Sequence, residues 1–249
     1  MRSCEIPPLT GALLAFLAAS FMFFQLKPAG ITKVEVEYRL KSWRAALLPF
    51  TLLTAVNIVN IQVGIIVLGF LNTDEQVAAM RIAERGGQFV ALSLTLVNMV
   101  IAPYIVRAHQ ELDGDLLQKM AAQSARAAFI IALPIAAVFV LLGKPIISLV
   151  FGIDYSDISY IPLVIVTFGQ LINVFFGPVG HLLAMSGNEK DSLNGQMLAL
   201  IINVIFAVIL TPFLGAVGAA LASTLSTIVW NVVLTFMVKQ RLNIKSAAF

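Results

Sequence analysis

The chain has 249 residues, of which 59% are hydrophobic and only 12% are charged, and its formal net charge is +3. Soluble domains carry about 45–50% apolar and about 25% charged residues. The composition therefore excludes an ordinary soluble domain and indicates a polytopic membrane protein. A single cysteine, Cys4, excludes a disulfide framework or a zinc cluster. We expect no metal, no cofactor and no ATP site formed by this chain itself.

Seven apolar segments are long enough to cross a bilayer, which requires about 20 apolar residues in a helix. They cover residues 8–26, 44–71, 76–107, 117–150, 158–186, 190–212 and 216–238. The sequence therefore predicts an all-α fold, a polytopic membrane bundle of about seven transmembrane helices. The predicted division is 1–42, a helix followed by a cytoplasmic linker, and 43–249, a six-helix lobe.

The first 43 residues allow more than one interpretation. The run LTGALLAFLAASFMFF after Arg2 suits a spanning helix, and its small residues are also found in cleaved signal peptides. The basic region before the run is short, and Glu5 and Pro7-Pro8 intrude in it, which favours the spanning helix. Residues 27–43 are too polar to span, so they form either a plain linker or an amphipathic helix on the inner leaflet.

Basic residues gather on one side of the predicted membrane. Eleven of them fall in or beside the loops 27–43, 108–116 and 187–190 and the C-terminal tail, whereas the opposite side has only Arg2 and Lys144. The positive-inside rule makes the richer side cytoplasmic. We expect a multi-pass protein of the inner (cytoplasmic) membrane, with its N-terminus outside and its C-terminus in the cytoplasm. An outside N-terminus is typical of the C-terminal portion of a longer transporter.

Amide side chains lie deep within two of the predicted spans. Span 44–71 contains Asn57, Asn60 and Gln62, and span 158–186 contains Gln170 and Asn173. A buried amide is costly unless it is paired. We predict that these amides line a polar cavity and contact substrate; the alternative is that they only form hydrogen bonds between helices.

Charged side chains also lie within the predicted spans. Arg81, Glu84 and Arg85 share one face of span 76–107, and Arg126 lies in the next span. The planar guanidinium matches phosphate oxygens, and charges inside a membrane commonly mark a substrate path. We predict that the three arginines contact an anionic substrate and that Glu84 pairs with the first two. The alternative is that the arginines extend to the membrane interface.

A glycine–proline pair, Gly177-Pro178, interrupts the fifth predicted span. Proline has no N–H, so the carbonyl of Val174 is expected to lose its regular helical partner. A bilayer tolerates such a break when neighbouring groups satisfy the freed carbonyl. We therefore predict one bent spanning helix over 158–186.

The run GQLINVFFGPVGHLLAMSGNEK, residues 169–190, resembles the corresponding helix of bacterial polysaccharide (O-antigen type) flippases. These flippases belong to a transporter superfamily that also contains multidrug exporters and peptidoglycan lipid flippases. The resemblance implies two six-helix lobes around a central cavity, with residues 1–42 similar to the last N-lobe helix and its connection and 43–249 similar to the C-terminal lobe. Gly64 stands where the family commonly has an acid, which weakens an ion-coupling role for that helix.

The resemblance implies a function in polysaccharide and lipopolysaccharide biosynthesis at the cell envelope. The chain is expected to be the C-terminal half of a flippase that moves a polyprenyl-pyrophosphate-linked glycan across the cytoplasmic membrane by alternating access. Because no bond is made or broken, no enzyme and no catalytic residue is expected. The implied partners are the lipid-linked oligosaccharide, membrane lipids, and either a missing N-terminal lobe or a second copy, with no nucleic acid.

Two other functions stay open. A multidrug or cation antiporter of the same superfamily requires a buried carboxylate, and only Glu84 lies well within a predicted span, beside two arginines. A non-transporting membrane scaffold is the other possibility, because one lobe cannot enclose a two-lobed cavity.

Overall fold

A computed structural model of the chain describes residues 16–22, 40–110, 114–242 and 244. The chain divides into two compact units, Met1–Trp43 and Arg44–Phe249. In the first unit, residues 16–22 are helical and lie inside the predicted span 8–26. The rest of that span and most of the predicted linker lie outside the described residues.

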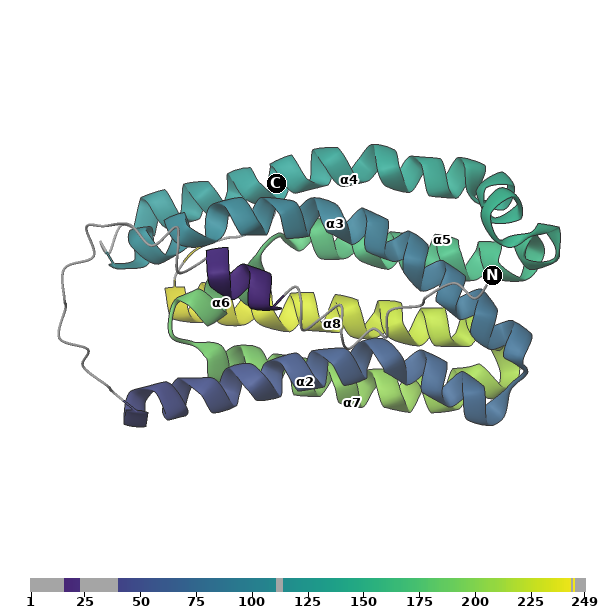
Figure 1. Cartoon of the computed structure of the whole chain (residues 1–249), viewed down its shortest axis with the longest axis horizontal. Helices are drawn as coiled ribbons and strands as arrows, with labels where there is room; N and C mark the ends of the chain where they lie inside the picture. Colours follow the sequence, from purple (N-terminus) through teal and green to yellow (C-terminus); the bar gives the residue numbers. More distant parts are fainter. Residues whose placement is uncertain (1–15, 23–39, 111–113, 243, 245–249) are drawn as a thin grey trace. The chain divides into compact units, whose positions relative to one another are not determined.

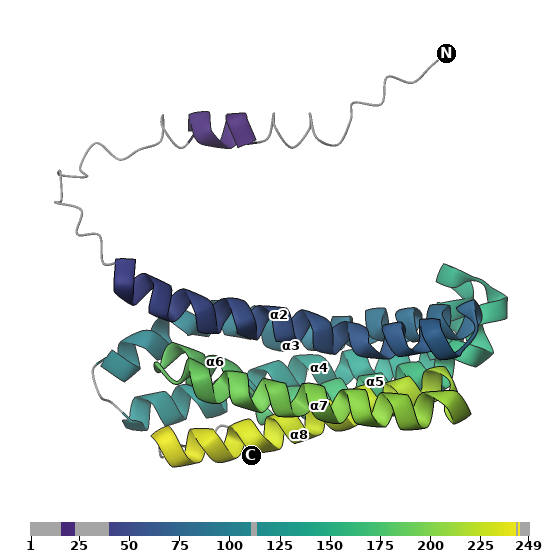
Figure 2. The same ribbon diagram turned by 90° about the horizontal axis from the view of Figure 1, so that it is seen from below.

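The second unit is a bundle of long helices lying alongside one another (Figures 1 and 2). The elements are α2 (Leu40–Leu71), α3 (Asp74–Gln110), α4 (Gly114–Phe151), η1 (Ile153–Tyr155), α5 (Ser156–Phe176), α6 (Val179–Met185), α7 (Glu189–Leu214) and α8 (Ala216–Leu242). Six segments are long and apolar enough to cross a membrane: Phe50–Leu71, Asp74–Ala108, Gly114–Phe151, Ile153–Phe176, Glu189–Leu214 and Ala216–Leu242. The prediction of an all-α, multi-pass membrane bundle is confirmed.

On α4 most of the buried positions are small residues, and many of its large apolar residues face outward. On α4 the buried positions include Ala121, Ala125, Ala128, Ala132 and Ala136. The same helix exposes Ile130, Leu133 and Leu141. Helices pack closely in lipid through small side chains, while bulky apolar ones contact the acyl chains. Helix α5 packs against α3, α4 and α8 and so lies at the centre of this arrangement.

The structure has a break where the sequence predicted a bent helix. Helix α5 ends at Phe176, and Gly177 adopts a φ of 75°, which favours glycine because it has no Cβ. The N–H of Gly177 donates to the carbonyl of Val174 at 3.0 Å, so this carbonyl does have a partner. The positive φ turns the chain out of the helical path, and a separate short helix, α6, follows Pro178.

Helices α7 and α8 form a tight hairpin. Gly215, with a φ of 56°, ends α7, and the N–H of Ala216 donates to Oε1 of Gln76 on α3 at 2.8 Å. A Cβ placed on Gly218 would lie 2.5 Å from the carbonyl oxygen of Leu210, so the two backbones are in direct contact there. The glycines thus hold α7 and α8 together, and the Gln76 amide links them to α3.

Candidate functional site

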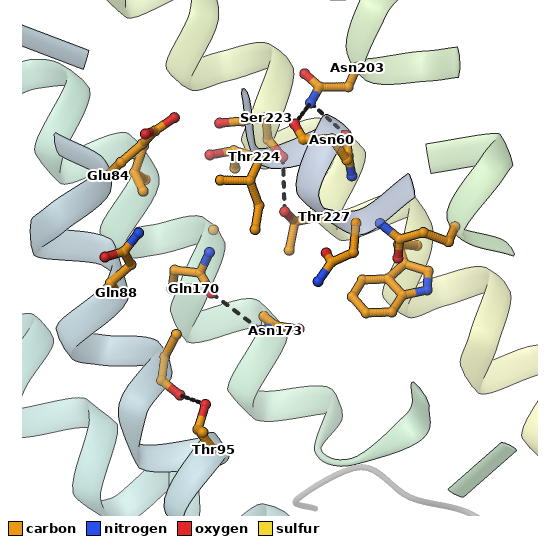
Figure 3. Close-up of a pocket in the computed structure, with 17 residues that line it drawn as sticks. Asn60, Glu84, Gln88, Thr95, Gln170, Asn173, Asn203, Ser223, Thr224 and Thr227 are labelled. Atoms are coloured by element: carbon orange, nitrogen blue, oxygen red, sulfur yellow. Dashed lines mark hydrogen bonds between the residues drawn. The ribbon is translucent and has the colours of Figure 1, made fainter. Parts of the chain in front are cut away.

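A polar cavity of about 370 Å³ lies among α2, α3, α5, α7 and α8 (Figure 3). Its lining consists of Asn57, Asn60, Ile61, Glu84, Gln88, Ala91, Thr95, Val166, Gly169, Gln170, Asn173, Gln196, Asn203, Ser223, Thr224, Thr227 and Trp230. Amides and hydroxyls dominate, there is one carboxylate, and no lysine or arginine of the described ranges is part of it. The cavity is therefore suited to an uncharged, hydrogen-bonding group.

Five of the nine side chains that the sequence singled out meet at this cavity. They are Asn57, Asn60, Glu84, Gln170 and Asn173, and they come from three different helices. Figure 3 shows the labelled ones among them around a common space. The structure thus brings together the amides that we expected to line a polar cavity, and their contact with substrate stays a prediction.

Arg81 and Arg85 on α3 lie outside the cavity lining and are exposed. Nη1 of Arg81 donates a long hydrogen bond of 3.5 Å to Oε1 of Gln62 on α2. Nη1 of Arg85 donates to Oε1 of Gln88, one turn further along α3, at 3.2 Å. Each arginine therefore pairs with an amide oxygen. Gln62 accepts this bond from Arg81 and does not line the cavity.

The predicted pairing of Glu84 with these arginines is wrong. In the part of the chain that the structure describes, the ion pairs join Lys144 to Asp157 and Arg241 to Asp191. Arg81 and Arg85 act on the Glu84 carboxylate only through their electrostatic field. The guanidinium groups bond to amide acceptors instead, Arg81 to Gln62 on α2 and Arg85 to Gln88 on α3 itself.

The structure also shows where two other residues singled out from the sequence, Arg126 and Gly64, lie. Arg126 is exposed on α4, a helix that contributes nothing to the cavity lining. Gly64 is buried, and a Cβ there would lie 3.3 Å from Cβ of Ala219 and 3.6 Å from Cε of Met80. Helix α2 thus packs against α8 and α3 at Gly64, and the packing leaves no room for an acid.

One side of the cavity, which we call the α3–α5 wall, carries Glu84, Gln88, Thr95, Gln170 and Asn173. Its amides form hydrogen bonds with each other and with neighbouring side chains. Nδ2 of Asn173 donates to Oε1 of Gln170 at 3.2 Å, and Oδ1 of Asn173 accepts from Nδ2 of Asn231 at 3.0 Å. Oε1 of Gln88 accepts from Arg85. None of the five residues has a buried polar atom without a partner.

The other side, the α7–α8 wall, carries Gln196, Asn203, Ser223, Thr224, Thr227 and Trp230. Nδ2 of Asn203 donates to both the carbonyl and Oδ1 of Asn60, at 2.9 and 2.7 Å, and so links this wall to α2. Both amide atoms of Gln196, Oδ1 of Asn203 and Nε1 of Trp230 are buried and have no hydrogen-bond partner.

Sequence reasoning missed most of the α7–α8 wall. Ser223, Thr224 and Thr227 lie in a run of small residues that predicts close packing, and each of their hydroxyls donates to a backbone carbonyl. A usable signal was the spacing of Gln196 and Asn203. These two polar residues are seven positions apart in an apolar helix, so they share one face.

A polar cavity within a bundle of membrane-long helices is the arrangement of a transporter lobe. The sequence profile of the family described as the lipid II flippase MurJ matches residues 8–249. The chain therefore belongs to this family of flippases. No curated protein matched the chain.

Two solved structures share the fold. "Lipid II flippase MurJ, inward closed conformation" aligns over 91% of this chain and 50% of its own, with a TM-score of 0.65 and 19% identity. "Inward-facing conformation of a multidrug resistance MATE family transporter of the MOP superfamily" aligns over 81% of this chain and 48% of its own, with a TM-score of 0.59 and 20% identity. The chain spans about half the length of each.

These matches confirm the superfamily that the motif resemblance indicated. They support a flippase of lipid-linked cargo, and they do not specifically support an O-antigen flippase or a role in lipopolysaccharide synthesis. The motif of residues 169–190 thus marks the superfamily rather than one branch of it.

Proposed function

We propose that this chain is one lobe of a flippase that moves a polyprenyl-pyrophosphate-linked glycan from the inner to the outer leaflet of the cytoplasmic membrane. The observation that carries the proposal is the amide- and hydroxyl-lined cavity inside six membrane-long helices. The family favours the peptidoglycan precursor lipid II as cargo over an O-antigen glycan.

The cavity has room for part of a glycan headgroup. Ligand pockets commonly measure about 300–1,000 Å³, and the cavity, at about 370 Å³, lies at the small end of this range. Because the chain spans about half the length of the two solved structures, a second lobe completes the enclosure in our proposal. That lobe is either an N-terminal half of the family type or a second copy of this chain, and the two rock about the cargo in alternating access.

The pyrophosphate has a separate place in this proposal. Arg81 and Arg85 flank Glu84, which lines the cavity, while their own side chains are exposed outside it. A guanidinium binds phosphate oxygens well. The pair is therefore positioned to contact the anionic part of a cargo whose glycan occupies the cavity. Arg126, on α4, is proposed as a further anionic contact on the cytoplasmic side.

The orientation of the lobe follows from its basic residues. With the C-terminus in the cytoplasm, the last turn of α8, which contains Lys239 and Arg241, lies at the inner leaflet. The start of α3, and with it Arg81, then lies toward the outer surface.

The test is rescue of bacteria depleted of their own lipid II flippase. The chain is expressed alone and fused behind an N-terminal lobe of a family member, and growth is measured together with lipid II exposed on the outer leaflet. We expect rescue by the fusion, and rescue by the chain alone if two copies assemble. Failure of both, with correct membrane insertion, would contradict transport and favour a scaffold. The same fusion in cells lacking an O-antigen flippase tests the other cargo.

One observation favours a second candidate, a cation antiporter. Glu84 lines the cavity and joins no ion pair among the side chains that the structure describes, so its carboxylate is available to a cation. Efflux of an organic cation that disappears in Glu84→Gln would support this function. Rescue of lipid II export by the Glu84→Gln fusion would count against a coupling role for the acid.

A further inference from the structure

The unpaired polar atoms of the cavity all lie on one wall. Ten buried side-chain nitrogen or oxygen atoms lack a hydrogen-bond partner in the described part of the chain, and four of them belong to cavity-lining residues: two on Gln196 and one each on Asn203 and Trp230. All three residues belong to α7 or α8. A buried polar group without a partner destabilises the fold, so a concentration of such groups on one wall requires an explanation.

Gln196 is the most unusual of these residues. Its side chain is 1% exposed, and neither Nε2 nor Oε1 has a partner. A glutamine amide both donates and accepts hydrogen bonds, so two kinds of partner are absent at one point of the wall. The terminal torsion of glutamine is broad. A modest rotation therefore turns the covered amide toward a group that enters the cavity.

The indole of Trp230 packs against two glycines, one of which, Gly195, directly precedes Gln196 in the chain. A Cβ on Gly180 of α6 would lie 3.3 Å from Cζ2 of the indole, and a Cβ on Gly195 would lie 3.7 Å from its Cδ1. The ring therefore fits where α6 and α7 carry no side chain. Its Nε1 is a hydrogen-bond donor without an acceptor. Gln196 and Trp230 thus combine one acceptor and two kinds of donor in a rigid, partly apolar setting.

We propose that Gln196 and Trp230 form a subsite for an uncharged sugar, which they recognise through its hydroxyl and acetamido groups. Sugar hydroxyls donate and accept, which matches the amide, and an acetamido carbonyl accepts from the indole N–H. The inference rests on the proposed function and deepens it by assigning the glycan, rather than the pyrophosphate, to the α7–α8 wall.

The charges of the site favour a neutral ligand at this wall. No lysine or arginine in the described ranges lines the cavity, so a phosphate bound there has no counter-charge. The one acid, Glu84, comes from α3, and Figure 3 shows it on the other side of the cavity from Asn203. A site of unpaired neutral donors and acceptors discriminates against ligands that cannot form the same hydrogen bonds.

Tryptophan fluorescence gives a direct test, because the sequence has only two tryptophans, Trp43 and Trp230. The variant Trp43→Phe makes Trp230 the only reporter. The chain in detergent is titrated through the millimolar range with N,N′-diacetylchitobiose, a neutral N-acetylated disaccharide, and separately with inorganic pyrophosphate. We expect a saturable change in emission with the disaccharide and none with pyrophosphate.

Two further variants separate recognition from folding. Gln196→Met keeps the approximate shape and removes both unpaired atoms, so we expect disaccharide affinity to fall about tenfold while Tm stays equal or rises. Thr167→Val removes another buried hydroxyl without a partner, on α5 but outside the cavity lining. We expect it to leave disaccharide binding unchanged.

Three outcomes would overturn the subsite: no saturable response to the disaccharide in the folded parent, equal binding by Gln196→Met, or a response to pyrophosphate that competes with the disaccharide. Binding is measured on the lobe alone, whereas rescue of growth needs the whole transporter. Disaccharide binding without rescue of growth would count against the flippase function but would still support the sugar subsite. Rescue of growth without disaccharide binding would support the flippase function and count against the subsite.

Discussion

The two walls of the cavity carry similar polar side chains but differ in how these side chains are hydrogen-bonded. On the α3–α5 wall, the amide of Asn173 bonds to both Gln170 and Asn231. On the α7–α8 wall, neither the amide of Gln196 nor Nε1 of Trp230 has a hydrogen-bond partner among the residues that the structure describes. An interhelical hydrogen bond stabilises a membrane bundle modestly, whereas an unpaired amide destabilises it. The bonded amides of the first wall therefore contribute to packing, and in our proposal the unpaired groups of Gln196 and Trp230 on the second wall bind the ligand.

This difference follows from how the helices are connected. The α7–α8 hairpin is fixed by glycine contacts at one end, where the backbones touch at Gly218, and by the ion pair of Arg241 with Asp191 at the other, with Nε at 2.7 Å from Oδ2. Along the middle of the hairpin, Oγ of Ser226 on α8 donates to the carbonyl of Ala199 on α7 at 2.7 Å. The amide of Gln196 is not used in these contacts, so in our proposal it remains available to a ligand.

The largest loss of stability is expected from Gly218→Ala. The new Cβ would lie 2.5 Å from the carbonyl oxygen of Leu210, so a backbone has to shift, which costs about 3 kcal/mol. The measurement is unfolding in mixed micelles. Gly69→Ala on α2 is the control, because the new Cβ would meet no atom of another helix within 4 Å and no loss is expected. Equal stability of the two variants would show that α7 and α8 are not held by backbone contact.

Smaller changes in stability are expected at two amides of the α7–α8 wall, a loss at Asn203 and no loss at Gln196. Asn203→Leu removes two hydrogen bonds to Asn60 and should destabilise the bundle by about 1 kcal/mol. Gln196→Met removes an amide that has no partner and should not destabilise it. Unfolding of the two variants is measured side by side. Losses of stability of similar size in both would mean that Gln196 is a structural residue.

A still smaller effect is expected at the end of the hairpin. Asp191→Asn removes the charge that pairs with Arg241, whose side chain is 56% exposed. Exposed ion pairs contribute about 0.5 kcal/mol or less and are screened by salt. The difference in stability between the parent and Asp191→Asn should therefore shrink as salt is added. A loss that is large and independent of salt would show that the ion pair, rather than the glycine contact, fixes the hairpin.

Of the changes considered, replacing Arg81 and Arg85 on α3 should affect stability least and transport most. Arg81→Ala combined with Arg85→Ala removes two exposed side chains that bond only to glutamine amides, so unfolding should change by less than about 0.5 kcal/mol. In the fused transporter we expect export to be lost while membrane insertion is kept. Normal export by this double variant would remove both arginines from the proposed substrate path.

Much of the fold was predictable from the sequence, because hydropathy over about 20 residues is a strong signal in a membrane protein. The amides were found for the same reason. Asn60 and Asn173 cannot face lipid cheaply, so they had to face a cavity or another helix. The break at Gly177 was foreseen only as a bend, because sequence marks a disturbed helix but does not give the sign of φ.

The remaining errors come from side chains whose direction the sequence leaves open. A helical face can be read from spacing, but a long side chain such as Arg85 extends to whichever acceptor is nearest, here Gln88. Hydroxyls such as that of Thr227 bond to their own helix and so give no hydropathy signal. That Gln196 has no partner depends on the packing of α7 against its neighbours, which only the structure shows.

The most direct test of the account is lipid II export by the two-lobe fusion that carries Gln196→Met, beside the fusion that carries Thr167→Val. Both variants remove a buried polar group without a partner, but only Gln196 lines the cavity. We predict that both fold, that Thr167→Val exports at the parent rate, and that Gln196→Met exports more slowly. Equal export by the two variants would contradict the claim that the α7–α8 wall binds the transported glycan.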